Sequence, residues 1–197
     1  MYCILYETLS SLVPYFNGLK PYQQLPFQYS LHILDSPDAE LRHEEFLHCD
    51  NSNPALPLTK TLISHIGNEG TVITWNMGFE KSCNSLLGTL LPEHAAFYAK
   101  LNDRIVDLMI PFSQNWYIDA GFFGSASIKK VLPVLVPELS HEMLDISDGA
   151  TAQRLWMEAV LDGKHNEEKE KILSNLLDYC KLDTLAMVEI YNVLRKL

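Results

Sequence analysis

The sequence predicts an α/β fold, with a mixed central sheet of about five strands flanked by helices. Three strand-like segments come first along the chain and indicate an antiparallel meander. Helical and strand-like segments then alternate, and two helical patterns close the chain. This order is typical of helices packed against a sheet. A length of 197 residues with 47% hydrophobic content suits one well-filled core, so we expect a single domain over residues 1–197.

The strands of the first third are predicted from apolar segments bounded by turn residues. The first strand, at residues 2–7 (YCILYE), ends in an acid, Glu7. A loop rich in proline and tyrosine follows at residues 14–26. Partial alternation at residues 27–34 and an apolar pattern at residues 41–48 then predict the second and third strands.

Turn residues and helical spacing organise the next part of the chain. Residues 50–57 (DNSNPALP) have the chemistry of a turn, and residues 58–67 show helical spacing that a glycine ends. The short apolar run at residues 72–75 predicts the fourth strand. It breaks into a helix that begins around Glu80 and continues to residue 91.

The alternation of helix and strand continues toward the middle of the chain. A helix is predicted at residues 93–101, and the strand-like segment at residues 104–108 has an acid, Asp107, inside it. An unpaired charge within an apolar strand is costly, so this acid needs a partner or a function.

Loops and helices make up the remainder. The stretch from Gly121 (GFFGSAS) predicts a loop, and residues 128–135 predict a short helix interrupted by Pro133. Two closing helices are expected at residues 150–161 and 167–197.

Composition excludes several classes of protein and site. The formal net charge of −10 argues against a broad basic surface for nucleic acid. The four cysteines form no C-x-x-C pair and the seven histidines show no ligand spacing, so none is assigned to a metal. No run approaches the roughly 18 apolar residues of a membrane span, and no leader opens the chain, so we expect a cytoplasmic protein with no membrane partner.

Tyr179 and Asp183 are the most informative pair of residues. Four residues apart on a predicted helix, they lie on the same face, so a phenol and a carboxylate can address one site. Glu7 at a strand end and Glu80 at a helix start could face the same site. Simpler explanations exist for both, since Glu7 could face solvent and the helix dipole favours an acid at position 80.

Three short motifs, taken in chain order, resemble those of the DnaQ-like 3′-to-5′ exonucleases of the ribonuclease-H-like superfamily, in the tyrosine variety called DEDDy: Glu7 in YET, the segment Asn76-x-x-Phe79-Glu80, and the pair Tyr179-x-x-x-Asp183. Longer segments are similar to a bacterial family of uncharacterised exonuclease-like domains: GLKPYQQLPFQYSLHIL, FEKSCNSLL, GSASIKKVLPVLVPELSH and YCKLDTLAMVEIY.

The resemblance implies a ribonuclease-H-like fold and a metal-dependent exonuclease that removes nucleotides from the 3′ end of DNA or RNA. Glu7, Glu80 and Asp183 would be ligands of one or two Mg²⁺ or Mn²⁺ ions, which prefer carboxylate oxygens. Tyr179 would orient the attacking water or help to deprotonate it. These four residues are the implied catalytic residues.

One departure from the motifs concerns Leu5. The resembled families carry Asp-x-Glu on the first strand, and the position two residues before Glu7 is here a leucine. Three acids then remain for two ions. The alternative is a catalytically degenerate ribonuclease-H-like domain that binds nucleic acid or a protein partner without cleavage.

Further candidates surround these motifs, each with a simpler explanation. Asp107 is either a support or extra ligand of the site, or a strand-end acid held by backbone donors. Asn76 contacts the substrate or forms a turn. Ser125, Ser127 and Lys129 combine hydroxyls, a helix start and a cation that could hold a phosphate, or they form an N-cap followed by solvated lysines.

Overall fold

A five-stranded mixed sheet forms the centre of the computed structural model, which describes residues 1–36, 39–140 and 144–196. The strand order is β3-β2-β1-β4-β5. β1 pairs antiparallel with β2, β2 pairs antiparallel with β3, and β4 and β5 run parallel to β1. The predicted α/β class and the antiparallel meander are confirmed, and the arrangement is consistent with a ribonuclease-H-like fold. The strands are β1 (Tyr2–Leu9), β2 (Leu25–Ile33), β3 (Arg42–Leu47), β4 (Val72–Thr74) and β5 (Ile105–Asp107).

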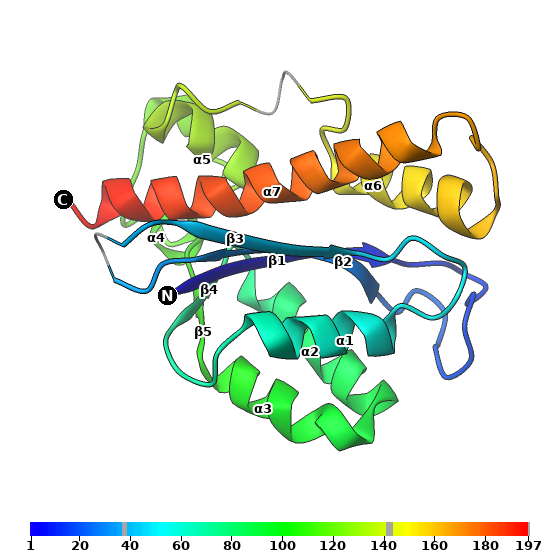
Figure 1. Cartoon of the computed structure of the whole chain (residues 1–197). Helices are drawn as coiled ribbons and strands as arrows, with labels where there is room; N and C mark the ends of the chain where they lie inside the picture. Colours follow the sequence, from blue (N-terminus) through cyan, green and yellow to red (C-terminus); the bar gives the residue numbers. More distant parts are fainter. Residues whose placement is uncertain (37–38, 141–143, 197) are drawn as a thin grey trace.

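Helices cover both faces of the sheet. Figure 1 shows α1, α2 and α3 below the sheet, and α5, α6 and α7 above it. Among the described helices, none is both long enough and apolar enough to cross a membrane. The helices are α1 (Ala55–His65), α2 (Met77–Leu90), η1 (Pro92–His94), α3 (Ala95–Asp103), α4 (Ile110–Ser113), η2 (Ala120–Phe122), α5 (Ile128–Leu135), α6 (Gly149–Trp156), a π-helical turn η4 (Met157–Leu161) and α7 (Lys169–Leu194).

The predicted strands all occur, with ends that differ by two residues or fewer. Two helices start about one turn earlier in the chain than predicted. α2 begins at Met77, about one turn before Glu80, because the Asp107 carboxylate accepts a hydrogen bond from the backbone N–H of Met77. α1 begins at Ala55, inside the predicted turn, because the Asn53 side chain accepts from the Ala55 N–H. Both starts depend on side chains that supply the missing acceptors of a first helical turn.

Other differences lie in the last hundred residues. The short helix η2, capped by Asp119, extends into the start of the stretch predicted as a loop from Gly121, and α4 was not predicted. α5 runs through Pro133 without interruption. The last closing helix covers Lys169–Leu194, and its predicted end at Leu197 lies outside the described residues, as does His141.

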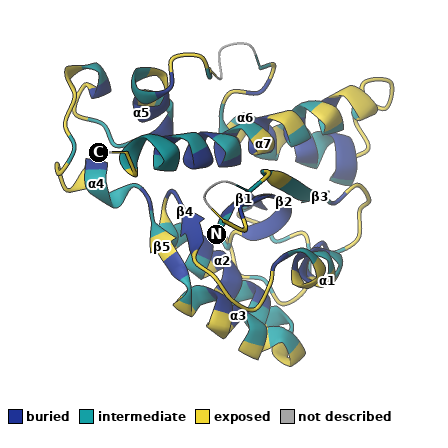
Figure 2. Cartoon of the chain, turned by 60° about the vertical axis from the view of Figure 1, so that its left-hand side comes forward, coloured by how far each residue is buried: buried dark blue, intermediate teal, exposed yellow. Residues whose placement is uncertain are grey.

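Apolar side chains fill the space on both sides of the sheet. One cluster joins the sheet to α1, α2 and α3, and two others join it to the helices on the opposite face. Every residue of β2 is buried, and Figure 2 shows β1 and β4 mainly dark blue, whereas β3 and β5 are largely teal and yellow. The core therefore holds the strand ends in fixed positions relative to α7.

Contacts with β1 and β2 fix the position of α7 along the sheet. The Gln28 amide donates to the backbone oxygen of Leu176 at 2.7 Å. One turn and two turns further on, the Cys180 thiol lies 3.9 Å from the Leu5 carbonyl, and the Thr184 hydroxyl lies 2.6 Å from that of Ser30. This row of residues at i, i+4 and i+8 forms the face of α7 that contacts the sheet.

Candidate active site

Glu7 lies where β1 ends and α7 passes over it. The ladder with β2 shifts register between Glu7 and Thr8, an irregularity of the kind that redirects a side chain near a functional site. The Glu7 side chain is buried, and its 8% exposure leaves little contact with water. Burial, followed by the negative charge of Asp183, raises the pKa of Glu7 to about 8, while the cation of Lys129 lowers it. Glu7 therefore lies near both a carboxylate, Asp183, and a cation, Lys129, from other elements.

Tyr179 and Asp183 each precede a sheet-contacting residue of α7 by one position. They consequently lie on a neighbouring stripe of the helix, and both are 3% exposed. Burial, then the charges of Asp183 and Glu7, raise the pKa of Tyr179 above its ordinary range, and a hydrogen bond with Asp183 acts in the same direction. The phenol is therefore a neutral donor beside two carboxylates.

Glu80 reaches the same region from the first turn of α2. It is 3% exposed, and its Oε2 atom has no hydrogen-bond partner within the described part of the chain. Burial raises the pKa of Glu80 to about 8, its own backbone N–H opposes this, and the charges of Asp107 and Glu7 raise it further. Glu80 therefore lies near enough to Glu7 for the charge of Glu7 to act on it, as the charge of Asp183 acts on Glu7.

Asp107 combines the two roles considered for it. Its carboxylate accepts hydrogen bonds from the N–H groups of Met77, at 3.1 Å, and Met109, at 2.9 Å. It is therefore a strand-end acid held by backbone donors. Its charge also acts on Glu80, so the same residue borders the acidic site.

Lys129 also reaches the acids. Its ammonium lies 5.4 Å from the centre of the Tyr179 ring and donates a hydrogen bond to the backbone oxygen of Ser147. Because its charge lowers the pKa of both Glu7 and Asp148, it lies among the carboxylates.

The other predicted substrate-binding residues have local contacts. Ser127 is the N-cap residue of α5, and its N–H donates to the Ser125 hydroxyl at 3.2 Å. Asn76 is the exposed N-cap residue of α2, and its backbone oxygen accepts from Phe79. These contacts match the simpler explanations. The Asn76 backbone oxygen also accepts from the N–H of Glu80 at 3.4 Å, whereas the contact given for Ser125 and Ser127 is with each other.

Asp148 and Gly149 were missed by the sequence analysis. Asp148 caps α6, accepting from the N–H of Thr151 at 2.9 Å and from its hydroxyl at 2.8 Å. A methyl group on Gly149 would lie 3.4 Å from Oε2 of Glu7, so the start of α6 contacts the site. The sequence Asp-Gly-Ala-Thr indicates a helix start, but no sequence signal places that start opposite Glu7.

The position of the missing acid is apolar. Leu5 lies two residues before Glu7 on the same strand, and successive alternate residues of a strand share a face. The side chain is partly buried and packs with the cluster that contains Cys3 and Ile73. No carboxylate therefore comes from this position of β1.

The donor set suits a hard divalent cation. The anionic groups of this site are carboxylates, the ligands that Mg²⁺ prefers, and Glu80 Oε2 is a buried acceptor to which no described residue donates. Within the described residues, no three His, Cys, Asp or Glu side chains are already grouped closely enough to hold a metal. A cation that keeps several of its waters could span such a set, as Mg²⁺ commonly does.

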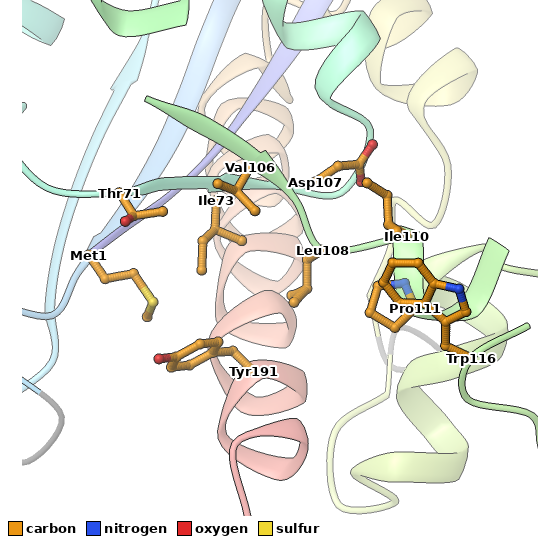
Figure 3. Close-up of a pocket in the computed structure, with 10 residues that line it drawn as sticks. All are labelled: Met1, Thr71, Ile73, Val106, Asp107, Leu108, Ile110, Pro111, Trp116 and Tyr191. Carbon is orange, nitrogen blue, oxygen red and sulfur yellow. The ribbon is translucent and has the colours of Figure 1, made fainter. Parts of the chain in front are cut away.

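A separate, apolar pocket of about 480 Å³ lies along β5. In Figure 3, Ile73, Leu108 and Tyr191 line it, and the Asp107 carboxylate points away from Tyr191. Of the predicted site residues, its wall contains Asp107 alone. This pocket therefore adjoins the acidic site without being part of it.

Comparison with known proteins gives a family and two distant relatives. The family model of a domain of unknown function, DUF2779, matches residues 2–127. The chain is similar to the uncharacterized protein MG366 of Mycoplasma genitalium, with 25% identity over 94% of this chain, and to its homolog in Mycoplasma pneumoniae, with 24% identity over 94%. It spans 30% of the length of either relative. No solved structure matches.

Proposed function

The chain belongs to the DUF2779 family, and we propose that it is a metal-dependent 3′-to-5′ exonuclease of the DnaQ-like, DEDDy type that acts on nucleic acid. One observation carries the proposal: Glu7, Glu80 and Asp183 are far apart in the sequence but are all buried. The charge of Asp183 raises the pKa of Glu7, and the charge of Glu7 raises the pKa values of Glu80 and Tyr179. Like charges in a buried site are costly, and a bound cation would offset that cost.

The residues divide the chemistry between them. Glu7, Glu80 and Asp183 would hold Mg²⁺ or Mn²⁺, which when bound would supply a Lewis acid for the phosphate and an activated water. Tyr179 keeps its proton at neutral pH because its pKa is raised. It therefore orients the water as a hydrogen-bond donor, and this role is favoured over that of a base.

The position of Lys129 supports the proposal that the substrate is a nucleic acid. Its ammonium lies among the acids and beside the Tyr179 ring, at the position where a phosphate approaching the carboxylates needs a positive charge. The substrate would be the 3′ end of DNA or RNA, whose phosphates Lys129 and the bound cation would both contact.

The state of the cysteines supports a cytoplasmic location. Cys3, Cys49, Cys83 and Cys180 are all free thiols, as is usual in a reducing compartment.

The test is a cleavage assay on 5′-labelled single-stranded DNA and RNA with Mn²⁺ or Mg²⁺. We expect a ladder of products shortened from the 3′ end. Asp183→Asn should abolish it, and Tyr179→Phe should slow it by about 10²-fold, the usual contribution of a group that positions or transfers a proton. Asp178→Asn, which changes an exposed aspartate on the same helix, is the matched control and should cleave normally.

Leu5 favours a second candidate function, that of a degenerate domain that binds without cleaving. Its apolar side chain occupies the position of an expected metal ligand and packs into the core. Binding of the labelled strand without products in either metal would support this candidate and contradict the exonuclease.

A further inference from the structure

We propose that Asp148 supplies the fourth carboxylate of the acidic site and takes the place of the aspartate that is absent at position 5. This inference rests on the proposed function, because it concerns how the site holds a divalent cation. It assigns a metal-binding role to a residue outside the three motifs.

The first support is the position of the segment that carries Asp148. The N-terminus of α6 approaches the end of β1 closely enough that a methyl group on Gly149 would lie 3.4 Å from Oε2 of Glu7. Asp148 directly precedes that glycine, and its charge acts on Glu7. The start of α6 thus approaches Glu7 from the helical layer, whereas an acid at position 5 would reach it from within the strand.

The second support is that the Asp148 carboxylate keeps acceptor capacity. Each of its oxygens accepts one hydrogen bond from Thr151, one from the N–H and one from the hydroxyl. A carboxylate has about four lone-pair sites, so each oxygen can still bind a cation or a cation-bound water. The two bonds from Thr151 fix the orientation of the carboxylate.

The third support is a tether that holds this segment on the site. Lys129 donates from its ammonium to the backbone oxygen of Ser147, the residue before Asp148, while lying over the Tyr179 ring. One side chain therefore links the start of α6 to α7. The charge of Lys129 also lowers the pKa of both Asp148 and Glu7.

The fourth support comes from the opposite side of the site and is independent of α6. Glu80 is 97% buried, since its exposed fraction is 3%, and it leaves Oε2 without a partner in the described part of the chain. Buried acceptors are normally satisfied, and an exception calls for an unseen ligand. A cation between Glu80 and Glu7 would satisfy this atom, and the charge of Asp148 also acts on Glu7.

The decisive variant is Asp148→Asn, measured by calorimetric titration with Mn²⁺ and by the Mn²⁺-induced rise in melting temperature. Asparagine is as good an N-cap residue as aspartate, so α6 should keep its start while the site loses one charge. We expect Mn²⁺ affinity to fall about tenfold or more. Without metal, the melting temperature should stay close to that of the parent.

Asp119→Asn is the matched control. Asp119 is also an N-cap aspartate, and its side chain accepts from the N–H of Gly121 at the start of η2. The substitution makes the same change of charge and of cap outside the acidic site, so Mn²⁺ affinity should equal that of the parent.

A rescue variant tests whether Asp148 replaces the absent acid. In Leu5→Asp/Asp148→Asn the number of carboxylates is restored, and Mn²⁺ affinity should recover most of the loss.

If Asp148→Asn binds Mn²⁺ as tightly as the parent, Asp148 is not a ligand, although the exonuclease proposal survives. If the parent itself binds no Mn²⁺, the metal site fails as a whole, and this inference fails with it.

Discussion

The environment of single residues explains why the charges of this site are costly. Glu7 and Glu80 are both less than a tenth exposed, and burial is the main cause that raises the pKa of each to about 8. Leu5, on the same strand as Glu7, avoids adding a further buried charge. The leucine therefore favours the stability of the metal-free fold over metal affinity.

Leu5→Asp should reverse that balance. Without metal, the variant should melt at a lower temperature, because a carboxylate replaces an apolar side chain in a packed cluster, at a cost of about 2–5 kcal/mol. Its Mn²⁺-induced rise in melting temperature should exceed that of the parent. Leu5→Asn is the control, since it introduces polarity without charge and should lose stability without the larger Mn²⁺ response.

At the scale of elements, a polar contact between α7 and the sheet fixes where Tyr179 and Asp183 lie. The Thr184 hydroxyl meets both Ser30, at 2.6 Å, and Nδ1 of His32, at 2.8 Å. A slide of α7 by one turn would break these bonds and leave buried polar groups unpaired, which costs about 1–3 kcal/mol for each group. The contact therefore specifies the register that presents the two catalytic candidates to Glu7.

The same contact predicts a dependence of stability on pH. Burial lowers the pKa of His32 to about 3, and the neighbouring charges of His43 from β3 and Lys181 from α7 act in the same direction. The folded protein keeps this imidazole neutral, while the unfolded chain protonates it below a pH of about 6.5. This contribution to stability is therefore complete above that pH and is lost as the pH falls toward 3.

His32→Asn keeps a polar atom toward Thr184 without a titrating group. Between pH 6.5 and 5.5, the unfolding free energy of the parent should fall more steeply than that of the variant, by up to about 1.4 kcal/mol per pH unit. Urea unfolding followed by tryptophan fluorescence measures both slopes. Equal slopes would show that the histidine titrates alike in the folded and unfolded states. The difference at pH 8 reports changes of packing alone.

The molecule as a whole is negatively charged, whereas its acidic site has a lysine, Lys129, beside it. The formal net charge of −10 repels a polyanion, so the proposed binding of nucleic acid would depend on the proposed cation and on a few local contacts such as Lys129. A molecule of this kind would hold the end of a strand and make few contacts along its length.

The salt dependence of binding should therefore be shallow. With Ca²⁺ in place of Mg²⁺ to slow cleavage, we expect log affinity for a 5′-labelled single strand to fall with log[NaCl] with a slope near −1. A single-stranded phosphate contact contributes about −0.7, so this slope corresponds to one or two such contacts. Fluorescence anisotropy at several salt concentrations measures it. A slope of −4 or steeper would instead indicate a broad basic surface.

Local patterns were enough to predict most elements and the residues of the motifs. The apolar segment before Glu7 and the spacing of Tyr179 and Asp183 are properties of neighbouring residues, and β1 and α7 form where those patterns lie. α1 and α2 start about one turn earlier in the chain than the local patterns predicted. For α2, the hydrogen bond that supports the first turn comes from Asp107, on a strand that follows much later.

The sequence by itself determined the α/β class and the order of the strands along the chain, because periodicity and turn chemistry act over short distances, and the resemblance of three motifs supplied the candidate acids. Only the tertiary structure decided that Leu5 packs into the core, that the charge of Lys129 acts on Glu7 and that the start of α6 lies against Glu7. These positions depend on how helices pack on the sheet, and packing is set by contacts between residues that are distant in the sequence.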